Sequence, residues 1–170
     1  FLPYINVTSS AGTGGTISPA GTTAVLRGQA VTFDVVPDNG YRILSITDNG
    51  VDQGNTSPYT ITNVTGPHDV VVTFKRVYYI TAIAGPNGTI SPIGDVAVDA
   101  GTSRNFSFSP DSGFRVNDVL IDGTSVGAVS TYTFTNIAAD HSIEVIFIDA
   151  PVPSTYCAVP AFITTPAPPN

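Results

Sequence analysis

Apolar and polar residues alternate along much of this chain with a period of two. Between Phe106 and Val116, two phenylalanines alternate with serines, and Phe114 resumes the alternation after a turn. This period is typical of a β-strand with one buried face. Pro110 cannot donate a hydrogen bond to a neighbouring strand, and the Asp and Gly that follow it favour a turn. The stretch therefore predicts a strand, a tight turn and a second strand.

The same pattern occurs 73 positions earlier, between Phe33 and Ile43. Aligning residues 15–74 with residues 88–147 at this constant offset gives 24 identical positions out of 60, without a gap. The shared positions are glycines and prolines, which mark turns, and apolar residues, which mark a core. The chain is therefore a tandem duplication.

Turn-forming residues recur about every 8 to 12 positions, the spacing of a β-sandwich or small barrel. The pattern of the second copy predicts seven strands, and the first copy follows the same plan. The strands of the second copy cover residues 79–84, 88–91, 96–97, 103–108, 115–121, 131–135 and 142–148. We predict an all-β fold with two tandem small Ig-like or β-sandwich modules, residues 1–76 and 77–149, and an extended C-terminal tail strand, residues 150–170.

Four residues, 75–78, join the two copies, so we expect their relative orientation to be largely fixed. Arg42 and Arg115 occupy equivalent positions just after the turn in each copy. We expect both arginines to brace that turn.

Composition narrows the class of protein. Of the 170 residues 11% are charged, well below the roughly 25% of an average soluble domain, and the formal net charge is -7. The six Lys and Arg residues are scattered, which argues against a nucleic-acid partner. No apolar run approaches the roughly 18 to 20 residues of a membrane span. The chain begins with Phe1, which favours a processed extracellular or cell-surface protein, the alternative being a boundary within a longer chain.

Five motifs of the second copy together resemble the divergent InlB-type B-repeat. They are Gly-Thr-Ile-Ser-Pro, Ser-Pro-Asp-Ser-Gly-Phe-Arg-Val, Val-Leu-Ile-Asp-Gly, Tyr-Thr-Phe-Thr-Asn-Ile and Asp-His-Ser-Ile, at residues 88–92, 109–116, 119–123, 132–137 and 140–143. The first copy departs from them at Val36, at residues 47–50 and at residues 66–68. The resemblance covers roughly residues 4–149. It implies a small all-β module used in tandem in prokaryotic cell-surface and secreted proteins as a spacer, stalk or binding surface, with no particular chemistry.

The candidate chemical motifs favour structural roles. Residues 123–127 fit the G-x-S-x-G pattern, but a nucleophile elbow needs a strand, a turn and a helix, and we interpret this segment as a hairpin loop. His68 and His141 are equivalent and lack a nucleophile or paired carboxylates, so we interpret them as turn histidines that bond a nearby loop. Residues 48–52 resemble part of a calcium loop without its remaining ligands. We predict no catalytic, cofactor-binding or metal-binding residues.

Five asparagines begin an N-x-Ser/Thr sequon and are glycosylation candidates: Asn6, Asn55, Asn63, Asn87 and Asn105. Asn87, in a Pro-Asn-Gly turn, is the best placed for modification. Surface glycans are also possible partners.

The two ends of the chain do not repeat and are apolar. The last 21 residues contain six prolines and no charged side chain. Cys157 is the only cysteine, which leaves a buried thiol or a bridge to another chain. In an extended strand, residues 156–163 would place apolar side chains on both faces, which favours insertion into a groove. The alternative is a flexible tail that spans a cell wall or lies near an anchor. The candidate subunit-interface residues are Tyr156, Cys157, Val159, Ala161, Phe162, Ile163, Phe1, Leu2, Tyr4 and Ile5.

The sequence thus favours a non-enzymatic structural subunit of an extracellular filament. In this hypothesis copies of the chain join head to tail by β-strand donation from one of the terminal segments. The alternative is a cell-surface adhesin or a carbohydrate-binding fragment of a larger secreted protein, which aromatic residues exposed in loops would favour.

Overall fold

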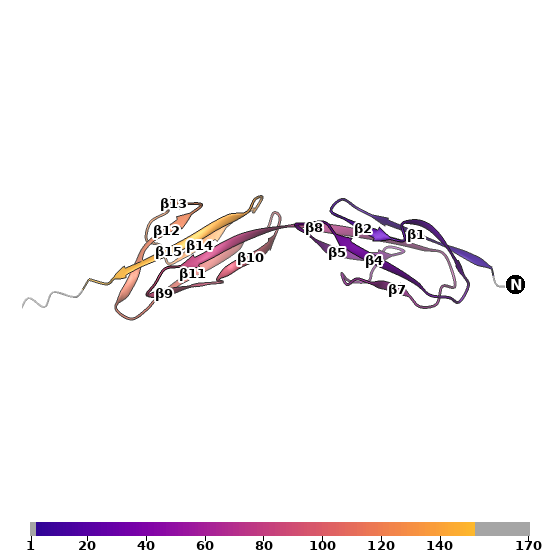
Figure 1. Ribbon diagram of the computed structural model, residues 1–170, viewed down its shortest axis with the longest axis horizontal. Helices are drawn as coiled ribbons and strands as arrows, with labels where there is room; N and C mark the ends of the chain where they lie inside the picture. The colour runs from indigo at the N-terminus through magenta and orange to yellow at the C-terminus, as the bar shows by residue number, and fades with distance from the viewer. Residues whose placement is uncertain (1–2, 152–170) are drawn as a thin grey trace, which may run out of the picture.

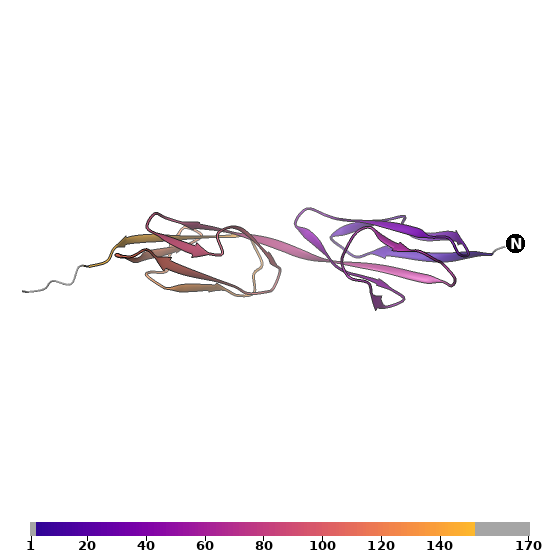
Figure 2. The ribbon, with the colours of Figure 1, turned by 90° about the horizontal axis from the view of Figure 1, so that it is seen from below.

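One 17-residue strand, β8 (His68–Ala84), runs through both halves of the molecule (Figure 1). The computed structural model describes residues 3–151, and β8 is the last strand of one β-sandwich and the first strand of the next. Figure 2 shows β8 passing from one module to the other without a break. Residues 75–78 are therefore the middle of a continuous strand that both modules share.

The first module contains the first half of β8 and seven more strands: β1 (Tyr4–Ala11), β2 (Gly15–Ser18), β3 (Gly21–Leu26), β4 (Val31–Pro37), β5 (Tyr41–Asp48), β6 (Val51–Asp52) and β7 (Tyr59–Ile61). Its larger sheet has the order β6-β5-β8-β1-β3, and β2, β4 and β7 form the smaller sheet. Neighbouring strands are antiparallel except for β1 and β8, which are parallel.

The second module repeats this arrangement with the second half of β8 and seven strands: β9 (Gly88–Ser91), β10 (Gly94–Asp99), β11 (Arg104–Pro110), β12 (Phe114–Ile121), β13 (Thr124–Ser125), β14 (Thr131–Phe134) and β15 (His141–Asp149). Its larger sheet has the order β13-β12-β15-β8-β10, and the smaller has the order β14-β11-β9. The register repeats as well, since Val7 pairs with His68 and the equivalent Ile80 pairs with His141. The predicted all-β fold is confirmed, and no helix occurs among the described residues.

Each module has its own apolar core between its two sheets. Phe33 and Phe106 are fully buried at equivalent positions, as the alternation predicted. In the second core the rings of Phe106 and Phe134 pack edge to face with centroids 5.9 Å apart. Gly88 is required next to this core, because a Cβ there would lie 2.4 Å from the ring of Phe147.

The turns follow the predicted chemistry. Strands β4 and β11 both end at their prolines, Pro37 and Pro110. The β5–β6 hairpin turns through Asn49 and Gly50, with φ of 49° and 79°. Two successive positive φ angles are typical of the tight hairpin turn that Asn-Gly favours. In residues 3–151 no helix is long and apolar enough to cross a membrane.

Candidate functional site

The two modules contact each other around the middle of β8. Arg42, at the start of β5, donates from Nε to Oδ1 of Asp99 at 2.7 Å and from Nη2 to the second carboxylate oxygen. Asp99 ends β10 and belongs to the second module. The expectation that Arg42 braces its own turn is wrong, because its guanidinium crosses to the neighbouring module. The equivalent Arg115 is exposed and forms no ion pair within residues 3–151.

Charge and hydrogen bonding reinforce each other in this pair. The hydrogen bonds from Arg42 hold the pKa of the Asp99 carboxyl below its usual range, although burial opposes the shift. The same bonds raise the pKa of Arg42. Both side chains are therefore charged at neutral pH, in the bidentate geometry that favours an Arg–carboxylate pair.

A second cation lies at the centre of the junction. The guanidinium carbon of Arg76 is 5.2 Å from the ring centroid of Tyr41 and 5.3 Å from that of Tyr78. These distances are typical of cation–π contacts. The backbone is held from both sides, since Val77 N–H donates to Gly40 at 2.8 Å and Ala100 N–H donates to Arg76 at 2.9 Å. The middle of β8 is thus fixed by groups from both modules.

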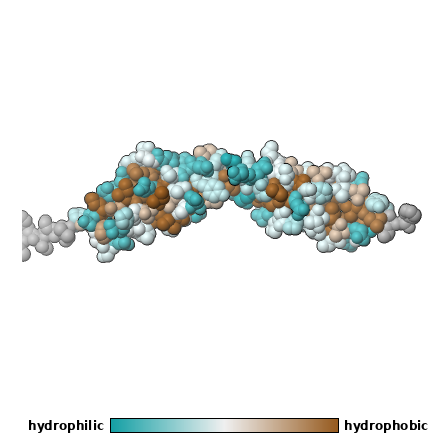
Figure 3. Space-filling view, viewed as in Figure 1, coloured by the Kyte–Doolittle hydropathy of each residue, from teal (hydrophilic) through white to brown (hydrophobic). Residues whose placement is uncertain are grey.

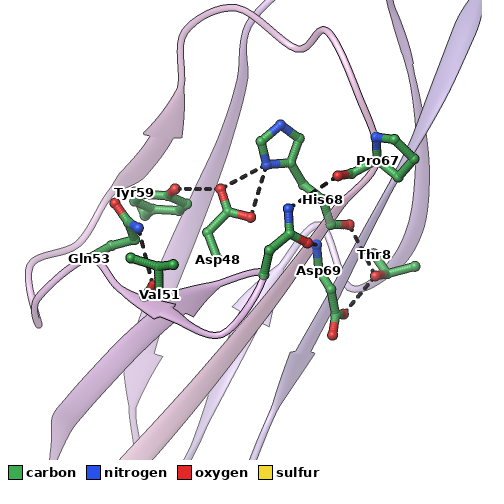
Figure 4. A network of polar contacts seen from close by, with 9 residues as sticks. Thr8, Asp48, Val51, Gln53, Tyr59, Pro67, His68 and Asp69 are labelled. Carbon is green, nitrogen blue, oxygen red and sulfur yellow. Dashed lines mark hydrogen bonds and ion pairs between the residues drawn. The ribbon is translucent and has the colours of Figure 1, made fainter.

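A polar network lies around His68 in the first module (Figure 4). The Nδ1 atom of His68 lies 2.8 Å from Oδ2 of Asp48, and the hydroxyl of Tyr59 donates to the same oxygen at 2.9 Å. Burial, together with the hydrogen bond and the charge of Asp48, raises the pKa of Tyr59 to about 12. The neighbouring Asn49 accepts a hydrogen bond from the backbone N–H of Asp69 at 3.0 Å.

In the second module a single carboxylate makes the two contacts that Asp48 and Asn49 make separately in the first: one to the histidine and one to the backbone N–H that follows it. His141 Nδ1 lies 2.7 Å from Oδ2 of Asp122, and Oδ1 of Asp122 accepts from the backbone N–H of Ser142 at 2.7 Å. Burial raises the pKa of the Asp122 carboxyl, but the bonds from His141 and Ser142 outweigh it and hold that pKa below its usual range. Asp122 is equivalent to Asn49, so the carboxylate partner of the histidine has moved by one position between the copies.

A second loop contact occurs in both copies, with the positions of its donor and acceptor reversed. Ser45 donates to Asp52 at 2.7 Å in the first module, and Ser125 donates to Asp118 at 2.7 Å in the second. Ser45 is equivalent to Asp118, so donor and acceptor have changed places. Each aspartate also accepts a backbone N–H at 3.0 Å, from Gly54 and Gly127 respectively. The same loop is therefore closed by the same pair of side chains in reverse order.

These contacts give the candidate residues structural roles. Both histidines bond an aspartate in a nearby loop, which confirms their interpretation as turn histidines. Residues 123–127 lie in the β12–β13 hairpin with no helix after them, which confirms the hairpin interpretation. In residues 48–52, Asp48 and Asp52 bond different partners. Among the described side chains no group of three His, Cys, Asp or Glu is placed to hold a metal ion.

The predicted terminal and glycosylation residues are placed as follows. Tyr4 is exposed on β1, and Ile5 packs against the first core. Phe1, Leu2, Tyr156, Cys157, Val159, Ala161, Phe162 and Ile163 lie outside the described residues. All five sequon asparagines are exposed: Asn6, Asn55, Asn63, Asn87 and Asn105. The sequence reasoning missed Asp99, although one signal was present: it replaces Leu26 in an otherwise similar repeat.

One comparison with known proteins found a match to the first module. Residues 5–77 match the family model of the divergent InlB B-repeat domain. A search of curated proteins and a search of solved structures each found no match. Domains of this family occur in cell-surface or secreted proteins, which suggests an extracellular location. The first module, residues 5–77, is therefore similar to the divergent InlB B-repeat domain, and the second module repeats the arrangement of its strands.

Proposed function

We propose that this chain is a non-enzymatic structural segment of an extracellular protein, in which β-repeat modules are joined end to end as a stiff rod. The observation that carries the proposal is the shared strand β8. At about 3.3 Å per residue, its 17 residues span roughly 55 Å without interruption. A flexible linker would let the two modules reorient, whereas a hydrogen-bonded strand does not.

The pairing of β8 supports stiffness on both sides of the junction. In the first module β8 lies between β1 and β5, and in the second it lies between β10 and β15. The pairing with β5 reaches Arg76, and the pairing with β10 begins at Val77. No residue of the strand is therefore left without a partner strand between the modules. The Arg42–Asp99 pair adds a second connection away from the strand.

The rod can be tested by measuring the distance between its two modules. Cys157 is replaced by serine, and spin labels are attached at Asn6→Cys and Glu144→Cys, which are exposed on β1 and β15. Double electron–electron resonance should give one narrow distance distribution. A variant with Gly-Ser-Gly-Ser inserted after Lys75 should give a broad one. Equally broad distributions for both proteins would refute the stiff rod.

In its stronger form, the proposal includes assembly of copies into a filament by strand donation from a terminal segment. Each module already contains eight strands among the described residues, so a donated strand would add at a sheet edge, such as β3. Negative-stain images of the secreted protein with and without residues 150–170 test this form. Filaments that persist after the deletion would exclude the C-terminal segment as donor, and their absence from the intact protein would exclude the filament.

The alternative is an adhesin or carbohydrate-binding fragment, and one observation favours it. Tyr79 is a large aromatic residue that stays exposed on the second module. Exposed aromatic rings are suited to stacking on ligands. Screening the intact chain and a Tyr79→Ser variant on a glycan array tests this function, which requires binding that the variant loses.

A further inference from the structure

The larger sheets of the two modules share strands and register but differ in the chemistry of their outer faces. Along β8 in the second module, Ile80 and Ala82 point into the core, so that Tyr79, Thr81 and Ile83 point outward. Five outward positions that are polar in the first module are apolar in the second; the pairs are Asn6 and Tyr79, Ser10 and Ile83, Thr47 and Leu120, Thr73 and Ile146, and Lys75 and Ile148.

The five apolar residues lie on three adjacent strands, β8, β15 and β12. We call them the outer patch: Tyr79, Ile83, Leu120, Ile146 and Ile148. Parallel pairing of β15 with β8 places Glu144 beside Ile83, and β12 continues the row with Leu120 beside Glu144. Tyr79, Ile83 and Ile148 remain 48%, 49% and 44% exposed. Figure 3 shows apolar side chains on the visible face of both modules.

The fold itself does not require this patch. The first module builds the same sheet with Asn, Ser, Thr and Lys at the equivalent positions. Two positions change in the opposite direction, Leu44 to Asn117 and Val71 to Glu144. Glu144 therefore gives the patch one carboxylate at its centre. Large apolar side chains grouped on one face of a sheet are typical of a surface that another segment covers.

We propose that the C-terminal tail of the same chain, centred on residues 154–163, covers the outer patch. The tail begins at the patch, because β15 carries Ile146 and Ile148 and ends at Asp149. The exit is held in place by a 2.8 Å hydrogen bond from Ala150 N–H to Gly113. The 19 residues after Pro151 can span about 60 Å, roughly twice the length of β15, so they can turn back along it.

The chemistry of the tail suits this surface. Residues 150–170 carry no charged side chain that would have to be desolvated against Tyr79 and Ile83. The hydroxyl groups of Ser154, Thr155 and Tyr156 can donate to a carboxylate such as that of Glu144. A segment tethered next to its site acts at an effective concentration in the millimolar range. The tether therefore favours the chain's own tail over that of another copy.

Disulfide trapping in the full-length protein tests the proposal, because Cys157 is the only cysteine. Single cysteines are introduced by Ile83→Cys and Ile146→Cys, with Ser107→Cys and Ser109→Cys as controls, which are exposed on β11 of the smaller sheet in the same module, within reach of the tail. An added oxidant accepts the two electrons and two protons that a pair of thiols loses in forming each bond. The two patch variants should form intramolecular disulfides at least several-fold faster than the controls, detected on non-reducing gels.

Each other outcome counts against the assignment. Equal rates for all four variants would mean random collision, and no bond in either patch variant would mean that the tail lies elsewhere. Disulfide-linked dimers would show that the patch accepts the tail of another copy. A second measurement uses no new cysteine: Phe162→Asp with Ile163→Asp should increase binding of an apolar fluorescent dye. That increase should vanish when Ile83 and Ile146 are also replaced by Ser and Thr, and an unchanged signal in the first variant would overturn the proposal.

Discussion

Arg42 of the first module donates two hydrogen bonds to Asp99 of the second. Among residues 3–151 it is the one ion pair that joins the modules. The arginine recurs as Arg115, but the position equivalent to Asp99 in the first module is Leu26. The contact therefore depends on a departure from the repeat. Both side chains are partly exposed, so the pair contributes little to the free energy of unfolding and acts mainly on orientation.

Replacing Arg42 by alanine should loosen the junction with little loss of stability. We expect less than about 1 kcal/mol in the free energy of unfolding, the usual range for exposed pairs. Residual dipolar couplings of the two modules should show a wider range of relative orientations. Arg115→Ala is the matched control and should leave those orientations unchanged.

The same contact predicts that the relative orientation of the two modules depends on pH. The folded-state pKa of Asp99 lies below its ordinary value. The stability that the charged carboxylate gives to the junction is therefore fully present above the unfolded pKa of about 3.9. It is lost as pH falls through the folded-state value. The modules should therefore reorient more freely in strong acid than at neutral pH. The Arg42→Ala variant should show no such change between the two conditions.

Asp48 should contribute more to the free energy of unfolding than Asp122, the aspartate that contacts the histidine of the second module. The side chain of Asp48 is 11% exposed and bonds both His68 and Tyr59, whereas that of Asp122 is 50% exposed. We expect Asp48→Asn to cost about 1–3 kcal/mol, the range for a disrupted buried hydrogen-bonding group, and Asp122→Asn to cost less. Urea unfolding of the two variants makes the comparison. Equal losses would contradict the difference in burial.

Tyr59 should titrate later than an ordinary tyrosine. Its pKa is raised to about 12, mainly by burial and then by Asp48. The stability that comes from keeping it neutral is present below the unfolded pKa of about 10 and is lost as pH rises through the folded value. Tyrosinate absorbance should show a late component that Tyr59→Phe removes and that Asp48→Asn moves to lower pH.

The exchanged Ser–Asp pairs predict a reciprocal rescue. Ser45→Asp alone would place a second carboxylate beside Asp52, and Asp52→Ser alone would remove the charged acceptor. Each single variant should therefore lose stability. The double variant, which reproduces the order found at Asp118 and Ser125, should recover most of that loss in a double-mutant cycle. Additive losses would show that the loop does not accept the reversed pair.

A glycine next to the first core should be irreplaceable. A Cβ at Gly15 would lie 2.4 Å from the ring of Phe74 and 2.7 Å from the carbonyl oxygen of Val36. We expect Gly15→Ala to cost about 1–3 kcal/mol, as overpacking does. Gly66→Ala is the control in the same module, because nothing lies within 4 Å of its added Cβ. Thermal unfolding should separate the two variants clearly.

Strands, turns and the duplication could be predicted from sequence because their signals are local. The alternation around Phe106 and Phe108 placed a strand, and Pro110 marked its end. The Pro-Asp-x-Gly turns and the Asn-Gly hairpin follow from backbone preferences that need no distant partner. Burial of Phe33 and Phe106 followed from the same two-residue period.

The junction could not be predicted in this way. Residues 75–78 have the same local pattern whether they form a linker or a strand, and the choice depends on β5 and β10, which pair with them from either side. The partner of Arg42 lies 57 positions away and is reached only because those strands meet.

Sequence alone determined which residues of each strand face away from the core. Only the tertiary structure decided that Ile83, Ile146 and Leu120 form one surface, because the parallel pairing of β15 with β8 brings together strands that begin 73 positions apart. Side-chain direction is a property of one strand, whereas a patch is a property of three strands in register.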